Sequence, residues 1–243
     1  MFSGEITNKS GKVIAQWLFT DRHAGLSSAP FDSLNLATHV GDAPLAVAAN
    51  RSIAADQLSV PASDVTWPGL VHGTDIGVIT QPLSLFPNVD ILVTAKSKRV
   101  LATLGADCVP LIAVDPEAKV CLTAHVGWRG AADSIHESIA QAITSQSGKL
   151  SQTQVILGPA ICGSCYEVDE QRFLEVTSVL SEAGIMRSES SYGVDIRKGL
   201  AAKLRSMGMK VSVVDVCTFE SSDYFSHRRD GQTGRQAGLV VLK

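Results

Sequence analysis

Four short apolar runs, separated by only a few residues each, constrain the fold of this 243-residue chain more than any other sequence feature. The runs are 90–94, 100–104, 109–114 and 120–124. Apolar runs of this length with turns between them are typical of buried β-strands. The connections are too short to hold crossover helices, so several of these strands must pair antiparallel.

Further strands are predicted at 13–19, 77–80, 154–157, 210–216 and 239–242. The segment 65–71 is also apolar but contains Pro68, which lacks a backbone N–H, and we expect an edge strand there. From Gly25 to Gly41 the chain is rich in Ser, Ala, Asn and Gly without a clear period, which predicts a long ordered loop. Such a loop either covers a functional site or is purely structural, and the sequence allows both.

Helices are predicted where apolar residues recur every three or four positions, at 42–58, 133–145 and 169–183 and after Asp195. The first begins at Asp42 and Pro44. In the second, Ile135, Ile139 and Ile143 form the apolar face, and Asp133 or Ser134 is the expected cap. No repeat or linker-like segment interrupts the chain. We therefore predict one α+β domain spanning 1–243, with mixed sheets covered by helices.

The composition excludes several classes of protein. Lys and Arg total 21 and Asp and Glu total 24, with no long block of like charge, so nothing indicates a nucleic-acid or membrane-surface protein. The first residues lack the basic and apolar regions of a signal peptide, and no run approaches membrane-spanning length. We expect a cytoplasmic protein whose five cysteines do not form a disulfide framework. The sequence does not specify an oligomeric state.

Three residues follow or interrupt these apolar runs and have side chains that bind metals. They are His72, Cys108 and His125. One thiolate and two imidazoles are a common zinc donor set, and three protein ligands leave a fourth position for water or substrate. Their wide sequence spacing requires a site assembled by tertiary folding. The alternative is that each is an ordinary buried or hydrogen-bonded core residue.

Short motifs in a fixed order along almost the whole chain carry a family resemblance. They are Ser33-Leu34-Asn35-Leu36 with Gly41-Asp42, Asn50-Arg51, Val71-His72-Gly73, Ala106-Asp107-Cys108-Val109-Pro110, Ala124-His125-Val126-Gly127-Trp128-Arg129-Gly130, Gly158-Pro159-Ala160-Ile161, Cys165-Tyr166-Glu167-Val168, Cys217-Thr218, Ser226-His227-Arg228-Arg229-Asp230-Gly231 and Thr233-Gly234-Arg235. The chain resembles the YfiH (DUF152) family, once called multicopper polyphenol oxidases and now read as purine nucleoside phosphorylases with adenosine deaminase activity.

This resemblance implies a zinc site at His72, Cys108 and His125 and an enzyme that acts on purine nucleosides and phosphate. The substrates would be adenosine, inosine and methylthioadenosine for phosphorolysis, and adenosine for deamination. Cys108, His125 and Arg129 are the candidates for the reacting centre. The family usually has Gln two residues before the first His, whereas this chain has Leu70. Asp107 is either a partner of a ligating histidine or a turn residue.

Phosphorolysis requires a cationic site for phosphate, which arginine provides with two-pronged geometry. Arg51 and Arg129 are the main candidates, followed by Arg228, Arg229 and Arg235. Arg129 lies between two glycines that allow close backbone approach, and a following helix N-terminus would favour an anion. The alternative for each of these arginines is an ordinary position on the protein surface. Trp128 either stacks on a purine or is simply buried.

Cys162-Gly163-Ser164-Cys165 has the spacing of a metal-binding or redox pair. One such pair without a second pair is weak evidence for zinc. A redox pair is expected at the start of a helix, whereas Gly158, Pro159 and Gly163 favour a loop. We interpret the motif as structural.

Three other functions fit the same residues. A copper polyphenol oxidase is one, because two His and one Cys also suit copper, although six histidines cannot supply the cluster of a multicopper oxidase as well. A cysteine hydrolase, with editing of peptidoglycan precursors as one role, would use Cys108 as nucleophile and His125 as base. A binding module with purely structural zinc would need a fourth ligand, such as Cys121, Cys162, Cys165 or His39.

Overall fold

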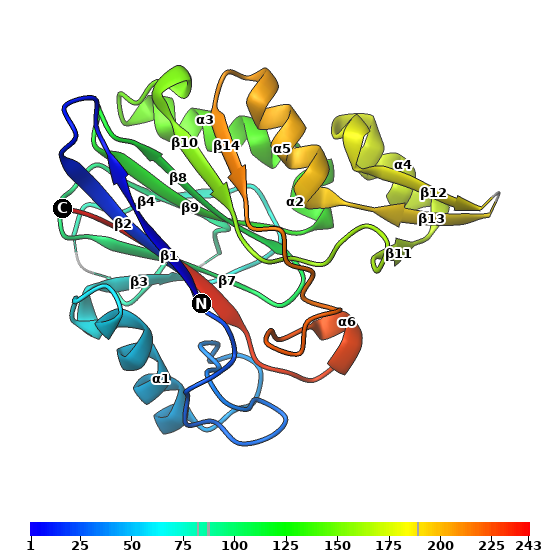
Figure 1. Ribbon diagram of the computed structural model, residues 1–243, viewed down its shortest axis with the longest axis horizontal. Helices are drawn as coiled ribbons and strands as arrows, with labels where there is room; N and C mark the ends of the chain where they lie inside the picture. The colour runs from blue at the N-terminus through cyan, green and yellow to red at the C-terminus, as the bar shows by residue number, and fades with distance from the viewer. Residues whose placement is uncertain (82, 87, 189) are drawn as a thin grey trace.

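In the computed structural model, two six-stranded β-sheets pack face to face and helices cover their outer faces (Figure 1). The structure describes residues 1–81, 83–86, 88–188 and 190–243. The first sheet has the order β1-β2-β15-β7-β3-β5, and the second has the order β14-β10-β8-β9-β6-β4. A small sheet with the order β11-β13-β12 lies beside the second sheet. The fold is α+β, with parallel and antiparallel pairs in both large sheets.

The first sheet contains β1 (Phe2–Thr7), β2 (Val13–Phe19), β3 (Val65–Pro68), β5 (Leu85–Phe86), β7 (Val100–Gly105) and β15 (Gln236–Leu242). The second contains β4 (Ile76–Val78), β6 (Ile91–Thr94), β8 (Val109–Asp115), β9 (Val120–Val126), β10 (Gln154–Leu157) and β14 (Lys210–Val213). The small sheet contains β11 (Glu167–Val168), β12 (Gly184–Ser188) and β13 (Ser191–Val194).

The helices are α1 (Pro44–Asp56), α2 (Trp128–Ala132), α3 (Ile135–Ser145), α4 (Glu170–Val179), α5 (Ile196–Ser206) and α6 (His227–Asp230). Helix α1 covers the outer face of the first sheet, whereas α2, α3 and α5 lie over the second (Figure 1). Short 3-10 helices occur at Ala62–Asp64, Leu150–Gln152 and Ser181–Ala183. None of the described helices combines the length and the apolar character needed to cross a membrane.

Most central strands are buried on both faces. In β8, Leu111 packs towards the helices and Ile112 packs between the sheets. In β15, Leu239 packs towards α1 and Val240 packs between the sheets. Strands covered on both faces read as continuous apolar runs rather than as an alternating pattern. This explains why the four runs that constrain the fold carry so few polar residues.

The four apolar runs are confirmed as buried strands β6, β7, β8 and β9. The expected antiparallel pairing is also confirmed, because β9 pairs antiparallel with both β6 and β8. Strand β7, however, belongs to the first sheet, between β15 and β3. The chain therefore changes sheets before and after β7, and the turn after β7 lies where the two sheets meet at one end.

Two local predictions were wrong. Strand β3 is not an edge strand, because the two-residue strand β5 pairs with its outer side. Pro68 is tolerated because β7 pairs only with Val65 and Thr66. At the start of α3, Ser134 is the N-cap residue, but it has a left-handed conformation (φ 61°) and its side chain makes no capping hydrogen bond. The unpredicted helix α2 ends just before it, so Ser134 joins two helices.

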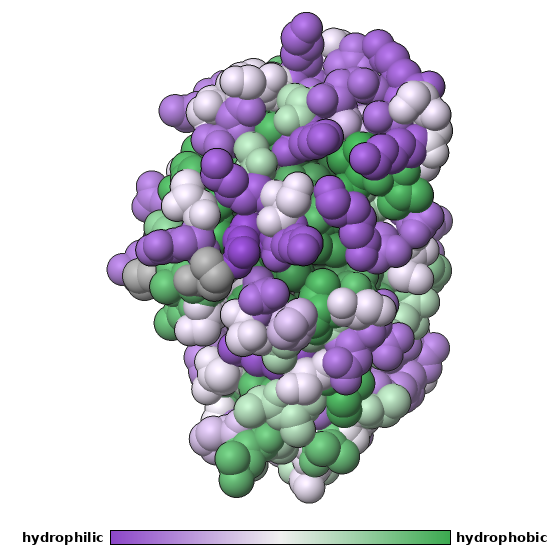
Figure 2. Space-filling view, turned by 90° about the vertical axis from the view of Figure 1, so that its left-hand side faces the viewer, coloured by the Kyte–Doolittle hydropathy of each residue, from purple (hydrophilic) through white to green (hydrophobic). Residues whose placement is uncertain are grey.

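The loop predicted at 25–41 contains no helix or strand. The buried Asn50 of α1 holds it in place by donating to the carbonyl oxygens of Ser33 and Asn35, at 3.0 and 2.9 Å. Asn50 also accepts from the Leu26 N–H at 2.8 Å. Seen from the side of β2 and β4, hydrophilic residues predominate on the surface, with smaller apolar areas between them in its upper, middle and lower parts (Figure 2).

Candidate active site

Two loops and the end of strand β9 bring His72, Cys108 and His125 together. Their ligand atoms all lie within 4.8 Å of one another, and the two imidazole rings stand edge to face with centroids 4.7 Å apart. His125 is the second-to-last residue of strand β9, and Cys108 lies in the turn from β7 to β8. His72 follows β3 and has a left-handed backbone (φ 62°). The predicted three-residue cluster is therefore present in the fold.

A buried carboxylate, Asp90, orients the two histidines. It accepts hydrogen bonds from the backbone N–H groups of Val71, His72 and Gly73, at 3.2, 3.1 and 2.8 Å. Its Oδ1 also lies 2.8 Å from Nδ1 of His125, which leaves the other ring nitrogen for the cluster. A ligating histidine is usually held in this way. Burial raises the pKa of Asp90, but the bonds from His125 and the backbone outweigh it and lower the pKa below its usual value.

A glycine keeps space open beside the three ligands. A β-carbon on Gly127 would lie 2.9 Å from Cδ2 of His72 and 3.2 Å from Sγ of Cys108. Both separations are shorter than normal carbon and sulfur contacts, so any side chain here would displace the ligands. Gly127 also lies at the start of α2, directly after β9. The close approach of backbone to ligands explains why the chain has glycine at this position.

The electrostatics of the cluster favour a thiolate. Burial raises the pKa of the Cys108 thiol, but the charge and hydrogen bonds of His125 and His72 outweigh it and lower the pKa to about 6. Burial lowers the pKa of His125, but Cys108 and Asp90 raise it to about 9. Without a metal ion these shifts describe a thiolate beside a protonated imidazole; a metal ion binds the thiolate and the neutral imidazole, so its binding would release the His125 proton that faces Cys108. The donor set, the oriented ring and the space beside Gly127 fit zinc.

The cluster lies between two cavities of about 330 Å³ each. The first, here called the arginine cavity, is lined by Arg172, Arg228, Trp128, Tyr166, Ile161 and Ile196 in addition to His72, Asp107 and Cys108. The second, the histidine cavity, is lined by His39, Leu70, His227 and Arg235 around the same ligands. His39 comes from the loop at 25–41, so that loop forms part of the wall. Leu70, where the family usually has Gln, gives that wall an apolar side chain.

The arginine candidates are dispersed. Arg129 is exposed on α2 with its guanidinium 5.3 Å from the Trp128 ring, and it lines neither cavity. Arg51 stacks 4.1 Å over Trp67 and donates to the Leu36 carbonyl at 3.0 Å. Burial lowers the pKa of Arg51 to about 10. Neither Arg51 nor Arg129 lines the arginine cavity or the histidine cavity.

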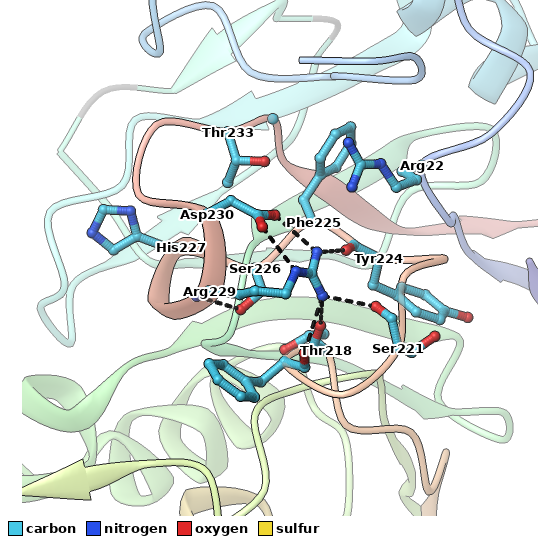
Figure 3. A network of polar contacts seen from close by, with 12 residues as sticks. Arg22, Thr218, Ser221, Tyr224, Phe225, Ser226, His227, Arg229, Asp230 and Thr233 are labelled. Carbon is cyan, nitrogen blue, oxygen red and sulfur yellow. Dashed lines mark hydrogen bonds and ion pairs between the residues drawn. The ribbon is translucent and has the colours of Figure 1, made fainter. Parts of the chain in front are cut away.

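Arg229 has a scaffolding position. Its guanidinium donates to the backbone carbonyls of Thr218, Phe219, Ser221 and Tyr224 at 2.8 to 3.1 Å (Figure 3). It also pairs with Asp230 at 2.8 Å. These contacts occupy its donors and fix the loop before α6. The neighbouring Arg228 and the more distant Arg235 are the members of this group that reach the cavities.

Arg172 was missed by the sequence reasoning. It lies on α4, its guanidinium lies 4.4 Å from the Trp128 ring, and it lines the arginine cavity. Its Nε is buried, and no hydrogen-bond partner exists for it within the described part of the chain. A buried donor without a partner costs about 1–3 kcal/mol, which a ligand oxygen would recover. No local pattern marks Arg172, because its proximity to the cluster depends on how α4 packs against α2.

Asp107 does not orient a histidine. Its carboxylate accepts from the Thr218 hydroxyl and from the Arg228 backbone N–H, both at 2.7 Å. It thus ties the turn that holds Cys108 to the C-terminal loop and to α6. The orienting carboxylate is Asp90, which the sequence reasoning missed. Its position at the beginning of an apolar strand run was the available signal, because a carboxylate there is buried and needs partners.

Residues 16–243 match the family model described as multi-copper polyphenol oxidoreductase laccase, which is the YfiH (DUF152) group. The chain belongs to this family. It is 39% identical to a purine nucleoside phosphorylase of Streptomyces coelicolor over 231 residues, covering 94% of this chain and 96% of the relative. It is 30% identical to the purine nucleoside phosphorylase YlmD of Bacillus subtilis, covering 98% and 91%.

Solved structures of the YfiH family have the same fold. YfiH of Bacillus licheniformis superposes with a TM-score of 0.90 at 28% identity, covering 95% of this chain and 96% of that one. YlmD of Geobacillus stearothermophilus gives 0.89 at 30% identity, covering 99% and 100%. The predicted resemblance is confirmed, and the names of the relatives support an enzymatic role.

Proposed function

We propose that this protein is a zinc-dependent enzyme that cleaves purine nucleosides with phosphate and deaminates adenosine. The observation that carries the proposal is a three-ligand cluster that opens onto a cavity with a buried, unpartnered arginine donor. His72, Cys108 and His125 are the proposed ligands. When bound, zinc supplies a Lewis acid with one coordination position open to water or to a substrate atom.

The protein residues around the ligands fit both substrates. Arg172 and Arg228 line the arginine cavity and offer donors to phosphate, which needs a cationic cradle. The rings of Trp128 and Tyr166 and the side chains of Ile161 and Ile196 give the same cavity an apolar wall suited to a purine. Arg228 lies 4.9 Å from the Tyr166 ring, which limits where its charge can move. The purine and the phosphate would thus be held close together beside the cluster.

An open site distinguishes this proposal from a closed structural zinc site. No fourth His, Cys, Asp or Glu joins the three ligands among the residues that the structure describes. Of the four suggested candidates, Cys121 is buried between the sheets, and Cys162 and Cys165 belong to a different group. His39 lines the histidine cavity but is not part of the ligand group. The cluster therefore has the three-ligand composition of a catalytic zinc site.

The first test is elemental analysis of purified protein, followed by product analysis. We expect about one zinc at this cluster. With adenosine and phosphate, adenine and ribose 1-phosphate should form, and adenosine alone should give inosine. Copper prefers the same donors, so copper-loaded protein should be assayed alongside zinc-loaded protein. Nucleoside turnover with copper but not with zinc would contradict the proposal.

A cysteine hydrolase is the second candidate, and one geometric observation favours it. Cys108, His125 and Asp90 are arranged as the nucleophile, the base and the orienting carboxylate of a cysteine hydrolase would be. The role of His72 distinguishes the zinc enzyme from the cysteine hydrolase, because the hydrolase has no role for a second imidazole beside the thiolate. Under the zinc mechanism, His72→Ala loses both metal and turnover. Full turnover in metal-free His72→Ala protein would establish the hydrolase instead.

A further inference from the structure

A second group of metal-binding side chains lies in two other loops. The Sγ atoms of Cys162, Cys165 and Cys217 and a carboxylate oxygen of Glu220 all lie within 4.8 Å of one another. Cys162 and Cys165 lie between β10 and β11, whereas Cys217 and Glu220 follow β14. This thiol group shares no residue with the His72, Cys108 and His125 cluster.

The fold brings a second pair of possible ligands, Cys217 and Glu220, next to the motif Cys162–Cys165. Cys162 and Cys165 have two residues between them, and so do Cys217 and Glu220. Structural zinc sites have four protein ligands and often draw them from two pairs of Cys or His with this spacing; here Glu220, whose carboxylate also binds zinc, takes the place of the fourth Cys or His. With zinc–sulfur bonds of about 2.3 Å, sulfur atoms in a tetrahedral site lie about 3.8 Å apart. The Sγ atom of Cys165 and a carboxylate oxygen of Glu220 are already 3.3 Å apart, and since all four donors lie within 4.8 Å, each of the other pairs would need to approach by at most about 1 Å.

Backbone contacts hold the two pairs in place without an ion. The Cys162 N–H donates to Sγ of Cys217 at 3.3 Å. The N–H groups of Cys165 and Tyr166 donate to the Cys162 carbonyl at 3.0 and 2.9 Å, which forms a tight turn. A parallel bridge joins Ala160 to Cys217. The turn and the bridge fix the two loops against each other, so the donors converge at little cost in conformational entropy.

Simple packing explains this group poorly. Cys121, also a free cysteine, is fully buried between the sheets and behaves as a small apolar residue. Cys162, Cys165 and Cys217 are half-buried, and none belongs to the three apolar clusters found among the described residues. The Cys165 thiol instead donates to the Glu220 carboxylate at 3.3 Å. A disulfide would use two of the thiols and leave the third and the carboxylate without a role.

We propose that Cys162, Cys165, Cys217 and Glu220 bind one zinc ion, which is a structural site separate from the active site. Its effect would be to fix the walls of the arginine cavity. Tyr166 directly follows Cys165 and lines that cavity. Thr218 directly follows Cys217 and donates to Asp107, next to the ligand Cys108.

Arg229 holds the same loop from its other side. Its guanidinium binds the carbonyls of Thr218, Phe219 and Ser221, as Figure 3 shows. The segment from Cys217 to Ser221 would thus be held both by a bound ion and by the half-buried Arg229. Metal at the thiol group would stabilise the loop that positions Asp107, without itself contacting substrate.

The test is metal content per chain in protein purified with reductant. Wild type should contain two zinc ions. Cys217→Ser and Glu220→Gln should lose one, and His72→Ala should lose the other. Ser164→Ala, an exposed change between two of the thiols, serves as the control and should keep both. Glu220→Gln removes only an exposed ligand, so it provides the test if Cys217→Ser fails to fold.

Cobalt substitution identifies the ligands. In His72→Ala protein loaded with cobalt, we expect strong thiolate-to-cobalt absorption from the three sulfurs, and Cys217→Ser in the same background should weaken it. The proposal is overturned if Cys217→Ser and Glu220→Gln both keep the metal content of wild type. It is also overturned if the three cysteines carry a disulfide and no metal. Because the two sites are counted separately, failure at His72 and failure at Cys217 remain distinguishable.

Discussion

The change Asp90→Asn tests whether the buried carboxylate sets up the metal cluster. The wild-type side chain accepts three backbone N–H groups and faces Nδ1 of His125. An asparagine has one acceptor oxygen in place of two, and its amide nitrogen cannot accept. At least one backbone donor would lose its partner, and the loop that carries His72 would loosen.

The size of the effect follows from these contacts. Each buried donor left without a partner costs about 1–3 kcal/mol of stability. Changes at a group that orients a ligating histidine lower metal affinity by about 10- to 100-fold. This corresponds to about 1.4–2.7 kcal/mol of binding free energy. Asp90→Asn should therefore weaken both the fold and the metal site.

Asp115 provides a matched control. It is also fully buried, and its carboxylate accepts the backbone N–H groups of Glu117, Ala118 and Lys149 at 2.7 to 3.1 Å. Asp115→Asn should lower the free energy of unfolding without changing zinc affinity at His72, Cys108 and His125. Zinc affinity is measured by competition with a chelator, and stability by urea unfolding. Wild-type zinc affinity in Asp90→Asn would refute the proposed role of this carboxylate.

Three further outcomes are expected. His72→Ala should lose zinc and adenosine turnover together, as measured by elemental analysis and chromatography of the products. Gly127→Ala should lower zinc content, because its β-carbon would lie 2.9 Å from the His72 ring; unchanged zinc would show that the ligands have room to move. Arg172→Ala should weaken phosphorolysis about 10- to 100-fold, the worth of a charge-assisted contact, and spare deamination. Arg129→Ala is its comparison and should alter neither rate, so the reverse result would place the phosphate beside Arg129.

Elements with strong local signals could be predicted from the amino-acid sequence. Strands β8 and β9 are continuous apolar runs, because both of their faces are covered. Helix α5 was predicted from its apolar spacing and from Asp195, whose side chain accepts the Lys198 N–H at 2.8 Å. The identities of His72, Cys108 and His125 as a group followed from their chemistry and from the family resemblance. Each of these signals depends on residue type and spacing, which the sequence shows directly.

Which residues contact one another depends on the three-dimensional packing of the chain. Whether β7 joins the sheet of β8 or the opposite one depends on packing between distant segments, which no local pattern encodes. That choice makes the turn that carries Cys108 cross from one sheet to the other, beside His72 and His125. The same is true of Arg172, which reaches the cavity through the packing of α4 against α2, and of Cys217, which meets Cys162 through the pairing of β10 with β14. A side chain's type is local, but its partners are set by contacts between residues far apart in the chain.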